Sequence, residues 1–149
     1  MFDGLMVDRN NPITNFHFIV NFGSETTTFQ EVILPESEIE VIEYRDGSDV
    51  SPSVRKIPGL VKYSNLILKR GLTKSLELYE WFKQTKQGTL ERRDIIVSIL
   101  NKEREPFATW KFKNCWPTKY GGSTLNANGN EIIIETLEIA IEDVDLEIK

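Results

Sequence analysis

The chain has 149 residues, 40% hydrophobic and 28% charged, which suits one globular domain with a buried core. Its formal net charge of −5 argues against a nucleic-acid-binding protein, whose surface should be basic, and no apolar run reaches the roughly 18–20 residues of a membrane span. The first eight residues have no basic region and no long apolar region, so we expect synthesis in the cytoplasm without a signal peptide. The single cysteine, Cys115, cannot form an internal disulfide and fits a reducing compartment.

Alternation of apolar and polar residues predicts short strands through most of the chain. In residues 15–22, the side chains of Phe16, Phe18, Val20 and Phe22 share one face. The same pattern, punctuated by Pro, Gly and Asn-Gly turn sequences, predicts further strands over residues 29–33, 39–45, 64–69, 94–101, 107–113 and 131–141. So many short strands indicate a mainly β protein, built as a sandwich or a barrel.

Residues 46–59 are the one long stretch without periodicity. About fourteen residues without a regular element are unusual in a compact domain, and such segments tend to be functional. We therefore expect an extended loop here.

One α-helix is predicted over residues 74–87. Thr73 is placed to cap its first turn, Lys83 and Lys86 occupy its last turn, and Gly88 ends it. Its apolar side chains cover more than half of the helix circumference, which is more than a surface helix needs. Either the helix is covered on two sides, by its own sheet and by another subunit, or a loop folds over the exposed rings.

The last strand combines acidic residues with a break in its alternation. Residues 131–149 contain seven acidic residues and one lysine, interleaved with Ile, Leu and Val. Ile132 and Ile134 share one parity, whereas Leu137, Ile139 and Ile141 share the other. A β-bulge near residues 135–136 would explain the change, as would burial of both faces against different neighbours.

The sequence shows no catalytic or cofactor-binding pattern. His17 is the only histidine and lies between two phenylalanines in a strand, so we interpret it as structural. One histidine and one cysteine are too few for a zinc site, and Cys115 is expected to be a buried, inert thiol. Acidic pairs such as Glu36/Glu38 and Asp143/Asp145 arise easily by chance in an acidic chain. We expect no enzyme activity, no metal and no cofactor.

A series of motifs nevertheless resembles one family over nearly the whole chain. The series begins with Phe16-x-Phe-x-Val20, Glu43-Tyr-Arg-Asp-Gly47 and the segment from Lys56-Ile-Pro-Gly to Gly71-Leu-Thr73. It continues with Leu78-Tyr-Glu-Trp81, Trp110-Lys-Phe-Lys-Asn-Cys-Trp-Pro117 and the Ile-rich segment 131–140. In order and spacing, these resemble the inner-tube proteins of contractile phage tails and of phage-tail-like extracellular injection systems. Cys115 stands where the family usually has alanine.

The resemblance implies a fold and a mechanical role for the whole chain, residues 1–149, as a single domain. The fold would be two packed antiparallel sheets closing toward a barrel, with one flanking helix. Six copies would form a ring, and rings would stack into a hollow tube that is driven through a target envelope while holding or passing cargo. The loop would make the contact between rings through Asp46, Gly47, Asp49, Ser51, Pro52, Arg55, Lys56, Pro58 and Gly59.

The expected partners are other copies of the chain, a sheath, a baseplate hub or spike, tube-terminating proteins and a cargo protein in the lumen. We expect release of the assembled particle by lysis, as a virion or as an extracellular injection particle. A baseplate-proximal tube initiator and a free ring-forming effector carrier are the alternative functions. Polar residues opposite the apolar strand faces are candidates for the lumen or for contacts between subunits, namely Lys69, Ser98, Lys111, Lys113, Glu135 and Glu138.

Overall fold

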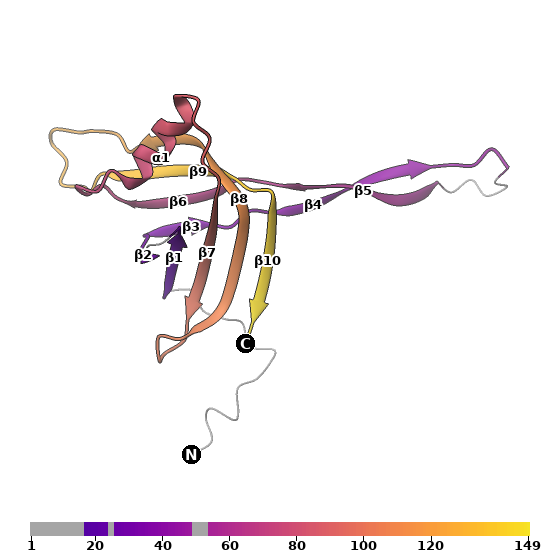
Figure 1. Ribbon diagram of the computed structural model, residues 1–149, viewed down its shortest axis with the longest axis horizontal. Helices are drawn as coiled ribbons and strands as arrows, with labels where there is room; N and C mark the ends of the chain where they lie inside the picture. The colour runs from indigo at the N-terminus through magenta and orange to yellow at the C-terminus, as the bar shows by residue number, and fades with distance from the viewer. Residues whose placement is uncertain (1–16, 24–25, 49–53) are drawn as a thin grey trace, which may run out of the picture.

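Ten strands and one helix make up the computed structural model, which describes residues 17–23, 26–48 and 54–149 (Figure 1). The first five strands are β1 (Phe18–Phe22), β2 (Thr26–Thr27), β3 (Glu31–Ile33), β4 (Ser37–Tyr44) and β5 (Arg55–Tyr63). The elements that follow are β6 (Leu66–Gly71), α1 (Glu77–Lys86), β7 (Arg93–Leu100), β8 (Pro106–Gly122), β9 (Ile134–Ala140) and β10 (Asp143–Ile148). The predicted mainly β fold with one helix is confirmed.

Seven strands follow one hydrogen-bonded path, β2-β1-β7-β8-β9-β6-β3, and the eighth strand of this sheet, β10, pairs with β8. The 17-residue strand β8 belongs to two layers, because its first part pairs with β7 and β10 and its last part with β9. Figure 1 shows β7, β8 and β10 running down one layer and β6 and β9 running across the other. The two layers are the predicted packed sheets, although they do not close into a full barrel.

Asn114 marks the bend of β8 between the layers. Its φ of 54° lies in the left-handed region, which asparagine tolerates better than most residues. Its backbone N–H donates to the Asp94 carboxylate at 3.1 Å, and its side-chain amide donates to Glu142 at 2.9 Å. The pairing of β7 with β8 changes register here, between Arg93 and Ile95. A β-bulge therefore turns one strand from the first layer into the second.

The core lies between the two layers and under the helix. Val20 and Phe22 of β1 are fully buried, as the alternation in residues 15–22 predicted; Phe16 of that pattern lies outside the described residues. The remaining core side chains come from both layers and from α1, and include Leu66, Leu68, Leu78, Trp81, Ile95, Phe112, Leu137 and Ile139.

The helix is covered mainly by its own subunit. Trp81 is buried, lies 6.2 Å from the ring of Phe22, and donates its indole N–H to the Glu91 carbonyl at 2.9 Å. Tyr79 and Phe82 pack against Tyr120 of β8. Of the apolar side chains that suggested a second covering subunit, only Leu76 is largely exposed. The broad apolar arc is thus explained chiefly by contacts within the chain.

The helix boundaries differ from the prediction of 74–87. The helix begins at Glu77, and its N-cap, Leu76, makes no side-chain capping bond. Thr73 is therefore not the cap: its hydroxyl instead accepts from the Ser75 N–H at 3.2 Å, in a short turn before the helix. The predicted end is confirmed, because Gly88 has a φ of 95° and Lys83 and Lys86 occupy the last turn.

Of the two explanations for the break in alternation, a bulge near residues 135–136 is wrong, because none is present in β9. Its pairing with β6 is continuous from Ile134 to Ile139, and Glu135, Leu137 and Ile139 alternate inward without interruption. Ile132 precedes the strand and is exposed, so its parity says nothing about the faces of β9. The acidic segment continues as β10, which pairs along the first part of β8.

Candidate inter-subunit surfaces

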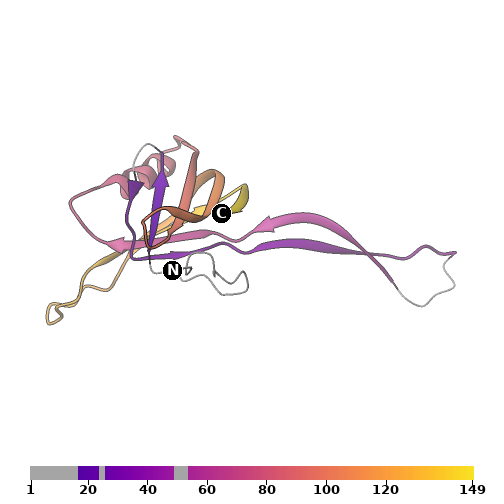
Figure 2. The same cartoon turned by 90° about the horizontal axis from the view of Figure 1, so that it is seen from below.

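A two-stranded arm formed by β4 and β5 projects from the body of the protein (Figures 1 and 2). The prediction of an aperiodic loop over 46–59 is wrong in its second half, because Arg55, Lys56, Pro58 and Gly59 belong to β5. Proline and glycine are uncommon inside central strands, so their presence in this segment made β5 hard to predict. Both are tolerated here because β5 is paired with β4 on one edge only. Asp46 and Gly47 lie at the tip, and Asp49, Ser51 and Pro52 lie outside the described residues.

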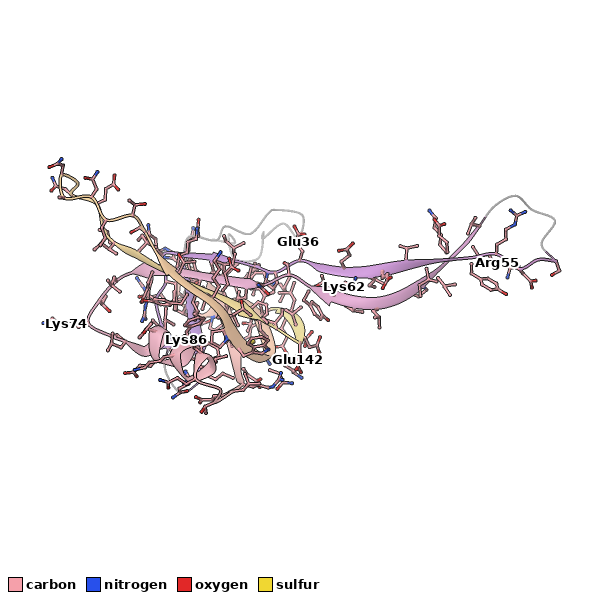
Figure 3. All side chains as sticks on the ribbon, turned by 90° about the horizontal axis from the view of Figure 1, so that it is seen from above. Glu36, Arg55, Lys62, Lys74, Lys86 and Glu142 are labelled. Atoms are coloured by element: carbon pink, nitrogen blue, oxygen red, sulfur yellow. The ribbon has the colours of Figure 1, made fainter. Side chains whose placement is uncertain are left out.

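The arm exposes apolar side chains on both of its faces. Cross-strand pairing places Ile42 opposite Ile57 on one face, and Val41 opposite Pro58 on the other. The large apolar residues of the arm are between 43% and 71% exposed, with Leu60 at the upper end. Charged residues on both strands keep this surface mixed rather than uniformly apolar (Figure 3). A ribbon that is apolar on both faces, and that no other described residue covers, marks a contact with another molecule.

Gly59 allows the two strands of the arm to lie close together. A Cβ atom at this position would lie 2.9 Å from Cδ1 of Ile42 and 3.1 Å from the Glu40 carbonyl oxygen. The strand pairing shifts register at the same place, between Ile39 and Val41. Gly59 therefore fits a bulge that twists the arm.

A second projection, residues 123–133, lies at the opposite end of the molecule from the arm (Figures 1 and 2). Leu125 and Ile132 are strongly exposed there, and Asn126 stabilises the turn by accepting the N–H of Asn128. The sequence analysis missed this projection, although Asn128-Gly129 was recognised as a turn sequence. Leu125 and Ile132, two apolar residues on either side of that turn sequence, could have indicated a projection that contacts another molecule.

The six polar strand positions separate into three groups. Lys69 and Glu138 lie on the same outward face of the second layer, where Lys69 pairs with Glu31 at 3.2 Å. Lys111 and Lys113 lie on the first layer, opposite Asp145 and Asp143 of β10. The remaining two, Ser98 and Glu135, are buried.

Neither Ser98 nor Glu135 can line a lumen. Ser98 shares a hydrogen bond of 3.2 Å with Thr109 on the neighbouring strand. Glu135 is 2% exposed and accepts two hydrogen bonds of 2.6 Å, from Nε of Arg70 and from the hydroxyl of Tyr120. Burial and the bond to Glu135 raise the pKa of Tyr120 to about 12. The prediction for Glu135 failed because its parity was compared with Ile132, which precedes the strand, whereas within β9 it has the inward parity of Leu137 and Ile139.

The described residues contain no cluster of three or more metal-ligating side chains. Within the same residues, no helix is long and apolar enough to cross a membrane. Cys115 is fully buried, as predicted, and burial raises the pKa of its thiol to about 12. A thiol in this state is a poor nucleophile.

The exposed apolar side chains of the arm and of the second projection indicate a protein that contacts other protein surfaces, and comparison with known proteins identifies the family. The model of the T4-like virus tail tube protein gp19 family matches residues 14–145. The chain belongs to this tail tube family. It is a structural subunit of the tube of a contractile tail or injection system, and not an enzyme.

Solved structures agree with this assignment. A chain in the extended sheath-tube complex of the PVC extracellular contractile injection system is 27% identical, with a TM-score of 0.84 and 95% of each chain covered. A chain in the anti-feeding prophage tube-terminating cap is 26% identical, with a TM-score of 0.85, covering 96% of this chain and 95% of that one. Hcp1 from Flavobacterium johnsoniae, at 17% identity and a TM-score of 0.59, covers 90% of this chain and 97% of its own, and shares the fold. No curated protein matches.

Proposed function

We propose that six copies of this chain form a ring and that rings stack into a hollow tube, with the β4–β5 arm making the contact between rings. The arm carries this proposal, because its apolar faces have no cover within the described part of the chain. Contacts between stacked identical rings are head-to-tail, so one surface must reach from each ring to the next. A projecting arm provides such a surface. Of the residues first assigned to this contact, Asp46 and Gly47 lie at the tip and Arg55, Lys56, Pro58 and Gly59 in β5, whereas Asp49, Ser51 and Pro52 lie outside the described residues.

The arm can be tested without disturbing the core. Ile42→Ser with Ile57→Ser removes one exposed cross-strand pair, and Leu90→Ser, at a similarly exposed leucine near the end of the helix, is the matched control. We expect the arm variant to keep its melting temperature and to form rings that do not stack, as seen by negative-stain electron microscopy. Tubes of normal length from the arm variant would refute an axial role for the arm.

We further propose that the outward face of β3, β6 and β9, with Lys69 and Glu138, lines the lumen. This face carries charges of both signs, from Glu31, Lys69 and Glu138, beside the exposed Ile33, and its charged residues favour passage of cargo over adhesion. Lys111 and Lys113, on the other layer, would then lie on the outside of the tube. A maleimide on a large polymer tests the assignment. Lys69→Cys should react in free subunits and be protected in tubes, whereas Lys113→Cys should react in both.

The wider partners follow from the relatives. The similar chains come from structures of a sheath-tube complex, a terminating cap, a sheath/tube terminator and a baseplate. We propose that this tube likewise contacts a sheath, a baseplate and a terminator, carries a cargo protein, and leaves the cell by lysis within an assembled particle. Co-expression with the neighbouring structural proteins, followed by microscopy of the particles, tests these contacts.

A further inference from the structure

An apolar groove of about 320 Å³ opens on the body of the subunit, beside β10. Its walls come from both layers and include Phe18, Leu34, Ile99, Trp110, Leu146 and Ile148. Leu146 is 48% exposed and Ile148 is 59% exposed. Apolar side chains on facing walls of one open groove are the mark of a binding surface.

The groove is open because the strand that would cover it leaves the sheet. β9 and β10 run one after the other along β8, and β6 covers the far edge of β9 from Leu66 onward. The chain before β6 is β5, which departs into the arm, and the Tyr63 hydroxyl donates to Asp143 at 3.0 Å near the point of departure. Among the described strands, β10 therefore pairs with β8 alone. Its outer edge presents backbone groups that can bind another strand.

We propose that this groove and the open edge of β10 receive the arm of a second copy of the chain, from the next ring. The inference rests on the proposed function and names the surface that receives the arm. The arm is already extended, so binding it as an added strand costs little ordering. The arm cannot pair with β10 of its own subunit, because it projects away from that strand (Figures 1 and 2).

Charge selects which edge of the arm docks. The polar face of β10 carries Asp143, Asp145 and Glu147, so the edge strand itself is acidic. On the side of β8, Lys113 and Lys111 lie opposite these acids and balance part of their charge. In the arm, β4 contributes Glu38, Glu40 and Glu43, whereas β5 contributes Arg55, Lys56 and Lys62. The basic edge of β5 is thus the complement of β10, and the acidic edge of β4 is repelled by it. Pro58 supplies no N–H, so the residues on either side of it make the backbone bonds.

Disulfide trapping tests the contact in assembled tubes. Leu146→Cys is combined in turn with Ile57→Cys and with Val61→Cys, and Leu90→Cys with Ile57→Cys is the control pair. Cys115 is fully buried and does not compete. After mild oxidation, at least one groove–arm pair should run as a ladder of covalent multimers on a non-reducing gel, because the sulfur atoms can reach bonding distance. The control pair and the single variants should run as monomers. Tubes that form normally but give no ladder overturn the docking proposal and leave the axial role of the arm intact.

Complementation of defects gives a second, independent test. Rings of a groove variant, Leu146→Ser with Ile148→Ser, retain an intact arm, and rings of the Ile42→Ser/Ile57→Ser variant retain an intact groove. Neither should stack alone, and a mixture should give pairs of rings and nothing longer. Normal stacking by the groove variant overturns the docking proposal. A lower melting temperature of the groove variant without pairing in the mixture also overturns it, in favour of a segment of the same chain filling the groove. Normal stacking by the arm variant alone overturns the proposed function itself.

Discussion

Replacement of Glu135 should cost more stability than replacement of any exposed carboxylate. The Arg70 and Glu135 side chains are only 9% and 3% exposed, and their 2.6 Å ion pair lies among apolar residues. Glu135→Leu leaves the guanidinium buried without its carboxylate, and Nη2 of Arg70 already has no hydrogen-bond partner. Breaking one side of such a pair costs about 3–5 kcal/mol. A domain is typically stable by only about 5–15 kcal/mol, so this is a large fraction of the total.

Urea unfolding of unassembled subunits, followed by tryptophan fluorescence, measures this loss. Glu138→Leu, on the outward face of the same strand, is the control and should change the free energy of unfolding by less than about 0.5 kcal/mol. Arg70→Met combined with Glu135→Leu removes both charges, and should recover most of the loss because a buried pair is roughly balanced by its desolvation. A single variant, Glu135→Leu, that loses less than about 1 kcal/mol would refute the reasoning, as would a double variant less stable than the single one.

Four further outcomes can be measured on the same subunit. The pKa of Tyr120 is raised from 10.0 to about 12, so the folded state holds the phenol proton to higher pH than the unfolded state does. The stability that this difference contributes should be lost as pH rises from 10 toward 12. Tyr120→Phe should make the free energy of unfolding depend less on pH in that window. Asn114→Val should lower the free energy of unfolding by about 1–3 kcal/mol through its left-handed backbone, and Asn114→Gly by clearly less, as denaturant titration will show. Gly59→Ala should impair stacking, as seen under the microscope, without lowering the melting temperature of the body. Cys115 should not react with a thiol reagent in native subunits and should react fully in urea; reaction at equal rates in both states would contradict its burial.

The fold could be predicted from the sequence where alternation was regular. Phe18, Val20 and Phe22 gave the core face of β1, and the sequence order of strands and helix was sufficient to define a mainly β protein. Prediction failed where a local rule competed with tertiary context. Thr73 is a good capping residue, yet the helix begins later because the segment before it turns first. The bend of β8 at Asn114 was invisible, since its cause is a pair of contacts with residues distant in sequence.

The candidate surfaces were only partly predictable for a related reason. Residues 46–59 were recognised as unusual, but Pro58 and Gly59 concealed a strand that forms without a sheet around it. Lys69 and Glu138 face outward as their parity predicted, whereas Glu135 is buried with Arg70 from another strand. Within β9, Glu135 has the parity of the buried Leu137 and Ile139, whereas Glu138 has the opposite parity. The partner could not be predicted, because Arg70 lies opposite Glu135 on the neighbouring strand β6 and a single sequence does not reveal which strands pair.

The arm is a direct continuation of the second layer, and this has a mechanical consequence. Strand β5 leads into β6 after only two residues, and in Figure 1 the two lie along one line. Tension applied along the arm is therefore delivered to β6 parallel to its axis. All six β6–β9 residue pairs then resist sliding together, and none is peeled open ahead of the others. A strand loaded in this direction gives way only when its hydrogen bonds fail collectively, which is the behaviour required of a part that must survive an abrupt thrust.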